Sequence, residues 1–145
     1  MLNAYKRVEA MLYNYKKTKA EINILNRQLE MLKNDYRGTG AISYDEKSSP
    51  TNKFNSSVEN EVIKRAKEIE ELKDRIQSKE VEINNIDDAL TILTENERFI
   101  ITERYFNQTR NKELAIKLNV TKDTASRYKT AIINKLIPLL TIGDK

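Results

Sequence analysis

Apolar residues recur at heptad spacing along the first part of the chain. This spacing predicts one helix of about 36 residues, roughly 54 Å long at about 1.5 Å per residue. Such a helix is too long to bury its apolar seam on a small core, so we expect it to pair with another helix. One seam position holds Met1, Val8, Tyr15, Ile22, Leu29 and Tyr36, and the other holds Ala4, Met11, Thr18, Leu25 and Leu32.

A second heptad stretch follows a capping-box pattern at residues 56–59. Two arrangements remain open: an antiparallel hairpin with the first helix, or pairing of this helix with its copy in a homodimer. We favour the hairpin because Arg65 and Lys79 interrupt the seam and would meet themselves in a symmetric parallel pair. Dimerisation through the outer face of the hairpin stays open. The seam positions are Val62, Ile69, Ile76, Ile83 and Leu90, with Val58, Leu72, Ile86 and Leu93.

Between the two stretches, residues 38–55 lack apolar periodicity. Gly38, Gly40 and Pro50 lie here, and closely spaced glycines are costly inside a helix. The sequence therefore predicts that the first helix ends near Gly38 and that a linker spans 38–55. Residues 1–93 then form a long two-helix, coiled-coil-like region.

Residues 94–145 have shorter helical patterns. Thr94 to Glu97 is a second capping box, which opens a helix through about Phe106. Two further patterns lie on either side of a break at residues 119–121, and this is the layout of a helix-turn-helix. Asn119 tolerates the left-handed conformation of such a turn. Thr121 is the expected cap of the second helix, which starts at Lys122.

The second of these helices has an apolar face and a polar face. The polar face contains Lys122, Asp123, Thr124, Ser126, Arg127, Lys129 and Thr130. The predicted apolar stripe contains Ala125, Tyr128, Ala131, Ile132 and Leu136, and in the preceding helix Leu114, Ala115 and Leu118 share a face. The sequence therefore predicts an all-α fold: a long N-terminal helical hairpin followed by a helix-turn-helix domain at 94–145.

Positive charge is concentrated in this last region. Residues 108–136 contain seven Lys or Arg and two Asp or Glu, in a chain with a formal net charge of +4. Residues 1–37, 38–93 and 94–145 carry +4, −4 and +4. A basic helix N-terminus suits a phosphate backbone, and Arg and Lys can reach guanine O6 and N7 in a major groove. The alternative is an ordinary helical corner with a solvated basic face.

Composition excludes several classes of chemistry. The chain has no cysteine and no histidine, which removes disulfides, thiol nucleophiles, imidazole bases and the usual zinc ligands. Glu95, Glu97 and Glu103 fit capping and surface roles better than a catalytic pair. We therefore expect no enzyme activity, catalytic residue, cofactor or metal. No apolar run reaches 18 residues and no signal-peptide pattern is present, so we expect a cytoplasmic protein without a membrane partner.

Residues in the last 52 positions resemble region 4 of bacterial sigma factors. The resemblance rests on Thr94 to Arg98, Ile101, Arg104 to Phe106, Lys112 to Ala115, Val120 to Arg127, and Lys135 with Leu136. The whole chain, with its long helical N-terminal half and the segment Ile42 to Asp45 followed by Ser49 and Pro50, more closely resembles phage regulators of the RinA and ArpU type, small activators of late, packaging or lysis genes. These resemblances imply a promoter-binding transcriptional regulator acting in a bacterial host.

In sigma region 4 the base-reading positions start the helix after the turn. They correspond here to Lys122, Asp123, Thr124 and Arg127. The expected phosphate contacts are Arg110, Lys112, Lys117, Ser126, Lys129, Thr130 and Lys135. The expected partner is double-stranded promoter DNA, and the sigma-factor resemblance also implies contact with host RNA polymerase. The alternative is a small terminase subunit, which recognises viral DNA for packaging and oligomerises through helices, although there the DNA-binding unit usually comes first.

Overall fold

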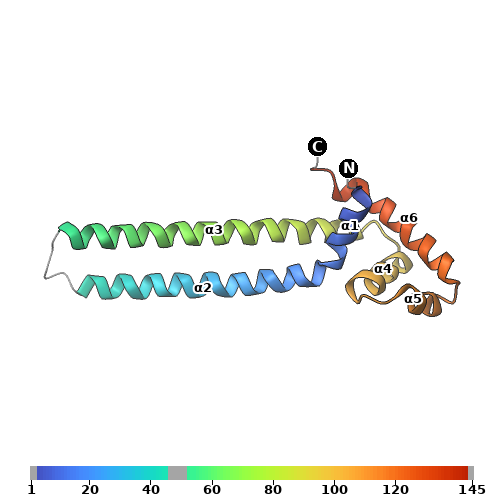
Figure 1. Cartoon of the computed structure of the whole chain (residues 1–145), viewed down its shortest axis with the longest axis horizontal. Coiled ribbons are helices and arrows are strands. Elements are labelled where there is room, and N and C mark those ends of the chain that lie inside the picture. The colour runs from blue at the N-terminus through green and yellow to red at the C-terminus, as the bar shows by residue number, and fades with distance from the viewer. Residues whose placement is uncertain (1–2, 46–51, 144–145) are drawn as a thin grey trace. The chain divides into compact units, whose positions relative to one another are not determined.

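The part of the chain that the structure describes is mostly helical. This computed structural model describes residues 3–45 and 52–143, with side chains for 3–35 and 57–143. The all-α prediction is confirmed, since every regular element is a helix (Figure 1). None of the described helices combines the length and hydrophobicity needed to cross a bilayer. The elements are α1 (Ala4–Tyr13), α2 (Tyr15–Asp45), α3 (Asn52–Leu90), α4 (Glu95–Ile101), the π-helix η1 (Thr102–Phe106), α5 (Asn111–Leu118) and α6 (Lys122–Leu140).

Contacts group the chain into two compact units. The terminal unit contains residues up to Lys19 and from Val81 onward, and the two-helix unit contains Ala20–Glu80. The sequence predicted a division at residue 93. In the structure, α1, the first turn of α2 and the last turns of α3 belong with the C-terminal helices.

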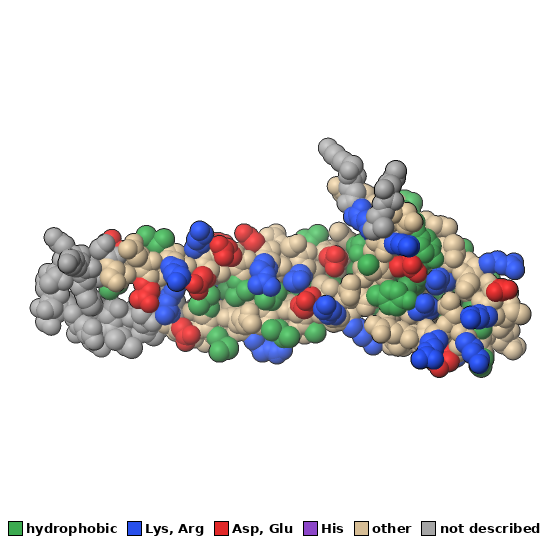
Figure 2. Space-filling model, in the orientation of Figure 1, with side chains coloured by type: hydrophobic (Ala, Val, Ile, Leu, Met, Phe, Trp, Pro, Cys, Tyr) green, Lys and Arg blue, Asp and Glu red, His purple; other side chains and the backbone are tan. Residues whose placement is uncertain are grey.

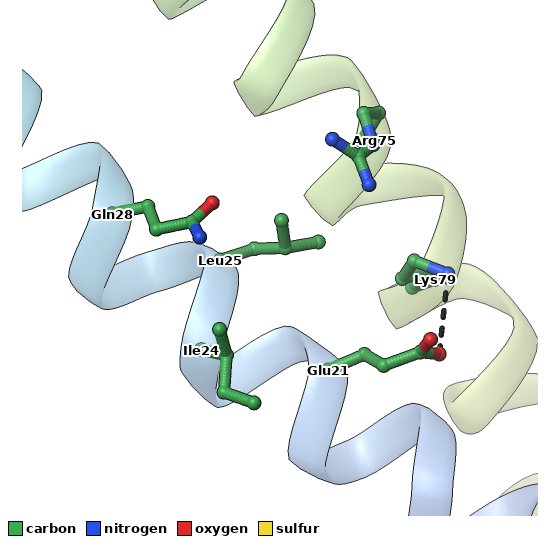
Figure 3. A pocket seen from close by; sticks show the side chains of 6 residues that line it. All are labelled: Glu21, Ile24, Leu25, Gln28, Arg75 and Lys79. Carbon is green, nitrogen blue, oxygen red and sulfur yellow. Dashed lines mark hydrogen bonds and ion pairs between the residues drawn. The ribbon is translucent and has the colours of Figure 1, made fainter.

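In the two-helix unit, α2 and α3 run antiparallel (Figure 1). Lys79, which interrupts the heptad seam, donates a hydrogen bond from Nζ to Oε1 of Glu21 over 3.3 Å. Both side chains line a shallow pocket with Arg75 and three residues of α2 (Figure 3). The apolar contact consists of Ile22, Leu25, Leu29, Ile69, Leu72 and Ile76, all of which the heptad pattern assigns to seams.

The helix bounds next to the predicted linker differ from expectation. Helix α2 continues through Gly38 and Gly40 to Asp45, and α3 begins at Asn52, before the capping box at 56–59. The linker prediction is therefore wrong for 38–45 and 52–55, while 46–51, including Pro50, lies outside the described residues. Each glycine costs a helix only about 1 kcal/mol, and extending an existing helix is far easier than starting a new one.

The first predicted helix is two helices. Helix α1 ends at Tyr13, and its C-cap residue Asn14 has φ −91° and ψ 3°. The backbone N–H of Asn14 donates to the carbonyl of Ala10 over 3.0 Å, and its own carbonyl accepts from the N–H of Thr18 over 2.7 Å. Backbone hydrogen bonding therefore continues from α1 into the first turn of α2, although the helix is interrupted at Asn14. The heptad pattern did not predict this break, because both helices need an apolar face.

The core of the terminal unit brings α1 and α6 together from opposite ends of the chain. Val8 and Leu12 of α1 are 0% exposed and pack in one cluster with residues of α3, α4, η1, α5 and α6. The other buried members are Ile86, Ala89, Leu93, Ile100, Ile101, Tyr105, Leu114, Ile132, Ile133 and Leu136.

The start of α2 also packs inside this unit. The ring of Tyr15 stacks on Phe106, with centroids 4.4 Å apart, and its hydroxyl donates to Oδ1 of Asp87 over 2.5 Å. Burial and this hydrogen bond raise the pKa of Tyr15 to about 12. Lys16 donates from Nζ to Oδ1 of Asn107 over 3.1 Å. The turns on both sides of Asn14 are therefore anchored to the same unit.

The segment after α3 begins as predicted. Thr94 accepts a hydrogen bond from the N–H of Glu97 over 3.2 Å, and the Glu97 carboxylate accepts from the N–H of Thr94 over 3.0 Å, which confirms the capping box. The predicted continuous helix instead changes to a π-helix at Thr102. It ends before Gln108, whose φ of 57° reverses the chain into α5.

We expect Leu12→Ala to destabilise the protein by about 2 to 5 kcal/mol, because it leaves a cavity in the core of the terminal unit. Ile24→Ala is the matched control: Ile24 lies on α2 and is half exposed, so its loss should change the free energy of unfolding by less than about 0.5 kcal/mol. Urea unfolding followed by circular dichroism measures both. If both substitutions changed the free energy of unfolding by the same small amount, α1 would not be part of the core.

Candidate nucleic-acid interface

The corner between α5 and α6 is a three-residue turn. Asn119 adopts φ 59° and ψ 44°, the left-handed conformation that the sequence predicted. Its backbone N–H donates to carbonyl oxygens in the last turn of α5. The N–H of Val120 donates to the carbonyl of Ala115 over 3.0 Å. The Thr121 side chain accepts from the N–H of Thr124 over 3.1 Å, which confirms the predicted cap of α6.

The packed face of α6 differs in part from the predicted stripe. Its buried residues are Ala125, Ile132, Ile133 and Leu136, whereas Tyr128 and Ala131 are exposed. At about 100° per residue, positions 129 and 133 lie closer to the centre of this face than 128 and 131 do. The stripe prediction is therefore wrong at Tyr128 and Ala131. Lys129, expected on the polar face, lies on the packed one.

The four predicted base-reading residues start α6. Lys122, Asp123 and Arg127 are exposed, and none of them has a side-chain partner among the described residues. Thr124 is half-buried, and its hydroxyl oxygen accepts a hydrogen bond from the Thr121 hydroxyl over 2.8 Å. The hydroxyl proton of Thr124 is still available to donate to an outside acceptor.

Two of the predicted phosphate contacts lie at the start of α5. Arg110 occupies the N-cap position and Lys112 lies in the first turn. Both side chains are exposed, and neither has a partner within the described part of the chain. With Lys122 and Arg127 they form a set of four unpaired cations, which we call the open cations. Three of them stand within a turn of the N-terminus of α5 or α6, where the helix dipole also favours an anion.

The other three predicted phosphate lysines are each held by a carboxylate. Lys117 pairs closely with Glu103, the ammonium of Lys135 lies 2.8 Å from Glu97, and that of Lys129 lies 3.4 Å from Glu9. The side chains of Lys117 and Lys135 are 51% and 49% exposed, but that of Lys129 is only 14% exposed. Figure 2 shows several Lys and Arg side chains over the helices of this unit, with acidic groups between them.

The two predicted hydroxyl contacts also have partners. Ser126 is half-buried, and its oxygen lies 3.4 Å from Nδ2 of Asn111. Asn111 in turn accepts from Nε of Arg104 over 2.8 Å. Thr130 is exposed, and its hydroxyl lies 3.4 Å from that of Tyr5. Ser126 therefore faces the start of α5, and Thr130 borders α1.

The sequence analysis did not predict several contacts in this unit. The Arg104 guanidinium lies over the rings of Tyr13 and Tyr105, at 5.5 and 5.6 Å from their centroids. Tyr13 and Tyr105 also meet edge to face, with centroids 4.8 Å apart. Glu9 accepts a hydrogen bond from Tyr105, which is 96 positions away. The one available signal was that Glu9 is the single acidic residue among the first 19.

Glu103 supplies a pH-dependent contribution to stability. A hydrogen bond from the Lys117 ammonium, followed by one from the Asn107 side chain, lowers the pKa of Glu103 below its usual value. A depressed folded-state pKa stabilises the fold above the unfolded pKa of about 4.3, and this stability is lost as the pH falls through the folded pKa.

We therefore expect Glu103→Gln to unfold more easily than the unaltered protein at pH 7, with a smaller further loss of stability below about pH 4. Urea unfolding at a series of pH values measures this difference. Glu95→Gln, at the exposed start of α4, is the control. An unchanged pH profile in Glu103→Gln would contradict the assigned role of the ion pair.

Among the described residues, no group of three or more His, Cys, Asp or Glu is arranged to hold a metal ion.

Comparison with curated proteins and with solved structures finds no match. Residues 4–138 match the sequence model of a family described as "Protein of unknown function (DUF722)", and the chain belongs to this family.

Proposed function

We propose that this protein is a sequence-specific DNA-binding protein, and that it regulates transcription of phage late genes in a bacterial host. The observation that carries the DNA-binding part is the set of open cations at the starts of α5 and α6. The regulatory role rests on the resemblance to sigma region 4 and to the RinA and ArpU type of regulator.

Phosphate binding is the contribution of the helix starts. Arg110 extends from the N-cap of α5 and Lys112 from its first turn, where unsatisfied N–H groups also point outward. Because neither side chain has a partner among the described residues, binding a phosphate breaks no existing ion pair. Neutralising phosphates releases counterions, so affinity should fall steeply as salt rises.

Base reading is the contribution of the exposed face of α6. Asp123 and Arg127 lie one turn apart, on the side opposite Ala125 and Ile132. A guanidinium can donate two hydrogen bonds to guanine O6 and N7, and a carboxylate can accept from cytosine N4. An exposed helix face of this kind fits a major groove. Lys122 and Thr124 add one cationic and one hydroxyl donor beside them.

This interface is smaller than the set predicted from sequence. Lys117 and Lys135 are about half exposed, so a phosphate can approach them only in competition with Glu103 and Glu97. Lys129 is largely buried in its pair with Glu9, and we leave it out of the phosphate contacts. RNA polymerase contact and homodimerisation stay predictions, and no feature of the described residues favours the terminase alternative.

The direct experiment is selection from a random-sequence duplex library with the full-length protein, followed by sequencing of the bound fraction. The proposal expects one enriched sequence. For each bound subunit, the sequence should be at most a few base pairs longer than the stretch that one helix reads in a major groove. Fusing the enriched duplex to a reporter in a bacterial host then tests regulation. Binding without any enriched sequence would contradict base reading.

Two substitutions should separate the two kinds of contact. Arg127→Ala should cost about 1 to 3 kcal/mol on the selected duplex and relax the preference at the positions that it reads. Lys112→Ala should weaken selected and scrambled duplexes alike and reduce the salt slope by about 1. Fluorescence anisotropy at several salt concentrations measures both.

Lys73→Ala is the control for these two variants, since Lys73 is an exposed cation of the two-helix unit. It should leave both affinities unchanged. If Arg127→Ala and Lys112→Ala instead lowered binding to every duplex equally, Arg127 would be a phosphate contact and the proposed division of roles would be wrong.

A further inference from the structure

A charge pair links α1 and α6, the first and the last helix of the terminal unit. One carboxylate oxygen of Glu9, Oε2, accepts a hydrogen bond from the Tyr105 hydroxyl over 2.6 Å. The same oxygen lies 3.4 Å from Nζ of Lys129. Glu9 therefore connects α1 to η1 and to α6 through a single atom.

Most of the surface of this contact is shielded from water. Tyr105 is fully buried, and the side chains of Lys129 and Glu9 are 14% and 21% exposed. Burial, followed by the hydrogen bond to Glu9, raises the pKa of Tyr105, so its hydroxyl remains a donor. Charge-assisted contacts in such surroundings are stronger and more directional than surface pairs. Unlike the lysines paired with Glu97 and Glu103, Lys129 has little access to an outside phosphate.

The position of Lys129 on α6 links this contact to base reading. Lys129 lies on the packed face of α6, two residues after Arg127 on the exposed face. A helix turns as a rigid body over such a distance, so a rotation that separates Lys129 from Glu9 also moves Arg127. The next residue, Thr130, meets Tyr5 of the same α1 at 3.4 Å.

Apolar contacts hold α1 against α6. Val8 and Leu12 lie on either side of Glu9 in the sequence, one position before it and three after it, and both belong to the core that contains Ile132 and Ile133 of α6. Apolar packing therefore places α1 along α6, but the hydrophobic effect is non-directional and by itself favours no single rotation of α6. The charge pair supplies the directional contact that the apolar residues lack.

We propose that Glu9 is a positioning residue for DNA reading, which fixes the rotation of α6 through Lys129 so that Arg127 meets its base correctly. The N-terminal helix is then a working part of the DNA interface, although it touches no base. This inference rests on the proposed function. It assigns Lys129 to the interior of the protein and removes it from the phosphate contacts predicted from sequence.

The competing role for the same pair predicts the opposite sign. If Lys129 were a phosphate contact restrained by Glu9, neutralising Glu9 would release the ammonium. Binding to every duplex would then become tighter, and the salt slope would increase. If Glu9 positions α6, neutralising it weakens only the binding that depends on correct base contacts.

The test uses Glu9→Gln in the full chain, with two probes: the duplex selected by the unaltered protein and a scrambled duplex of the same composition. The ratio of the two affinities should fall by about five- to tenfold, the lower part of what one well-formed base contact contributes. Affinity for the scrambled duplex should stay within about twofold. Glu21→Gln, which removes the carboxylate of the Glu21–Lys79 ion pair between α2 and α3, should leave the ratio unchanged.

Lys129→Gln provides a second route if Glu9→Gln folds poorly. It removes the same ion pair from the other side, retains a hydrogen-bond donor, and should lower the ratio by a similar factor. The double variant should lose no more than either single one, because both act through one contact. Circular dichroism and urea unfolding establish that each variant is folded at the assay temperature.

Three results would overturn the proposal. An unchanged ratio in both folded variants would reduce Glu9 to a purely structural residue. Tighter binding of both duplexes by Glu9→Gln would return Lys129 to the phosphate contacts. A selection that enriches no sequence would instead remove the proposed function itself, so failure at that earlier step is distinguishable from failure of the role of Glu9.

Discussion

The terminal unit depends on the packing of α1 against α6. Val8 and Leu12 have no exposed surface and enter a core whose other members come from residues beyond position 85. Fully burying two such side chains contributes about 1.5 to 3 kcal/mol each relative to exposure. This packing brings Glu9 to Lys129 and Tyr5 to Thr130. It also places Tyr13 beside Arg104, whose contact with Asn111 continues to the start of α5.

Carboxylates from outside the basic segment divide its cations into two groups. Glu9, Glu97 and Glu103 each hold one lysine, and each also accepts another hydrogen bond within the fold. The paired lysines therefore help to hold α1, α4 and η1 against α5 and α6. The open cations remain at the starts of the two helices. The unpaired positive charge therefore covers a smaller surface than the total number of cations in the sequence suggests. A narrow cationic surface limits sequence-independent attraction and leaves room for base contacts to discriminate.

Local signals in the sequence predicted the local features of the structure. The cap at Thr121, the capping box at Thr94 and the left-handed Asn119 each depend on residues within a few positions, and all three are present. Seam residues such as Leu25 and Ile76 were also identified, because heptad spacing marks an apolar face whatever covers it. The all-α class follows from these repeats.

Features that depend on distant partners were not predictable in this way. Val8 fits a coiled-coil seam and a globular core equally well, so the break at Asn14 has no distinct pattern. Ala131 and Ile133 are both apolar, and only the direction of packing decides which of them is buried. Lys129 has the same chemistry whether it faces a phosphate or Glu9, 120 positions earlier. Gly38 and Gly40 have a small helix cost, which extension of α2 outweighs.

Hydrogen–deuterium exchange of the full chain, with and without the selected duplex, tests the central claim that the starts of α5 and α6 bind DNA. The account predicts slower amide exchange in residues 110–118 and 121–131 when the duplex is bound, with no change in residues 57–80. Binding that left 110–131 unchanged, or that protected 57–80 alone, would contradict it.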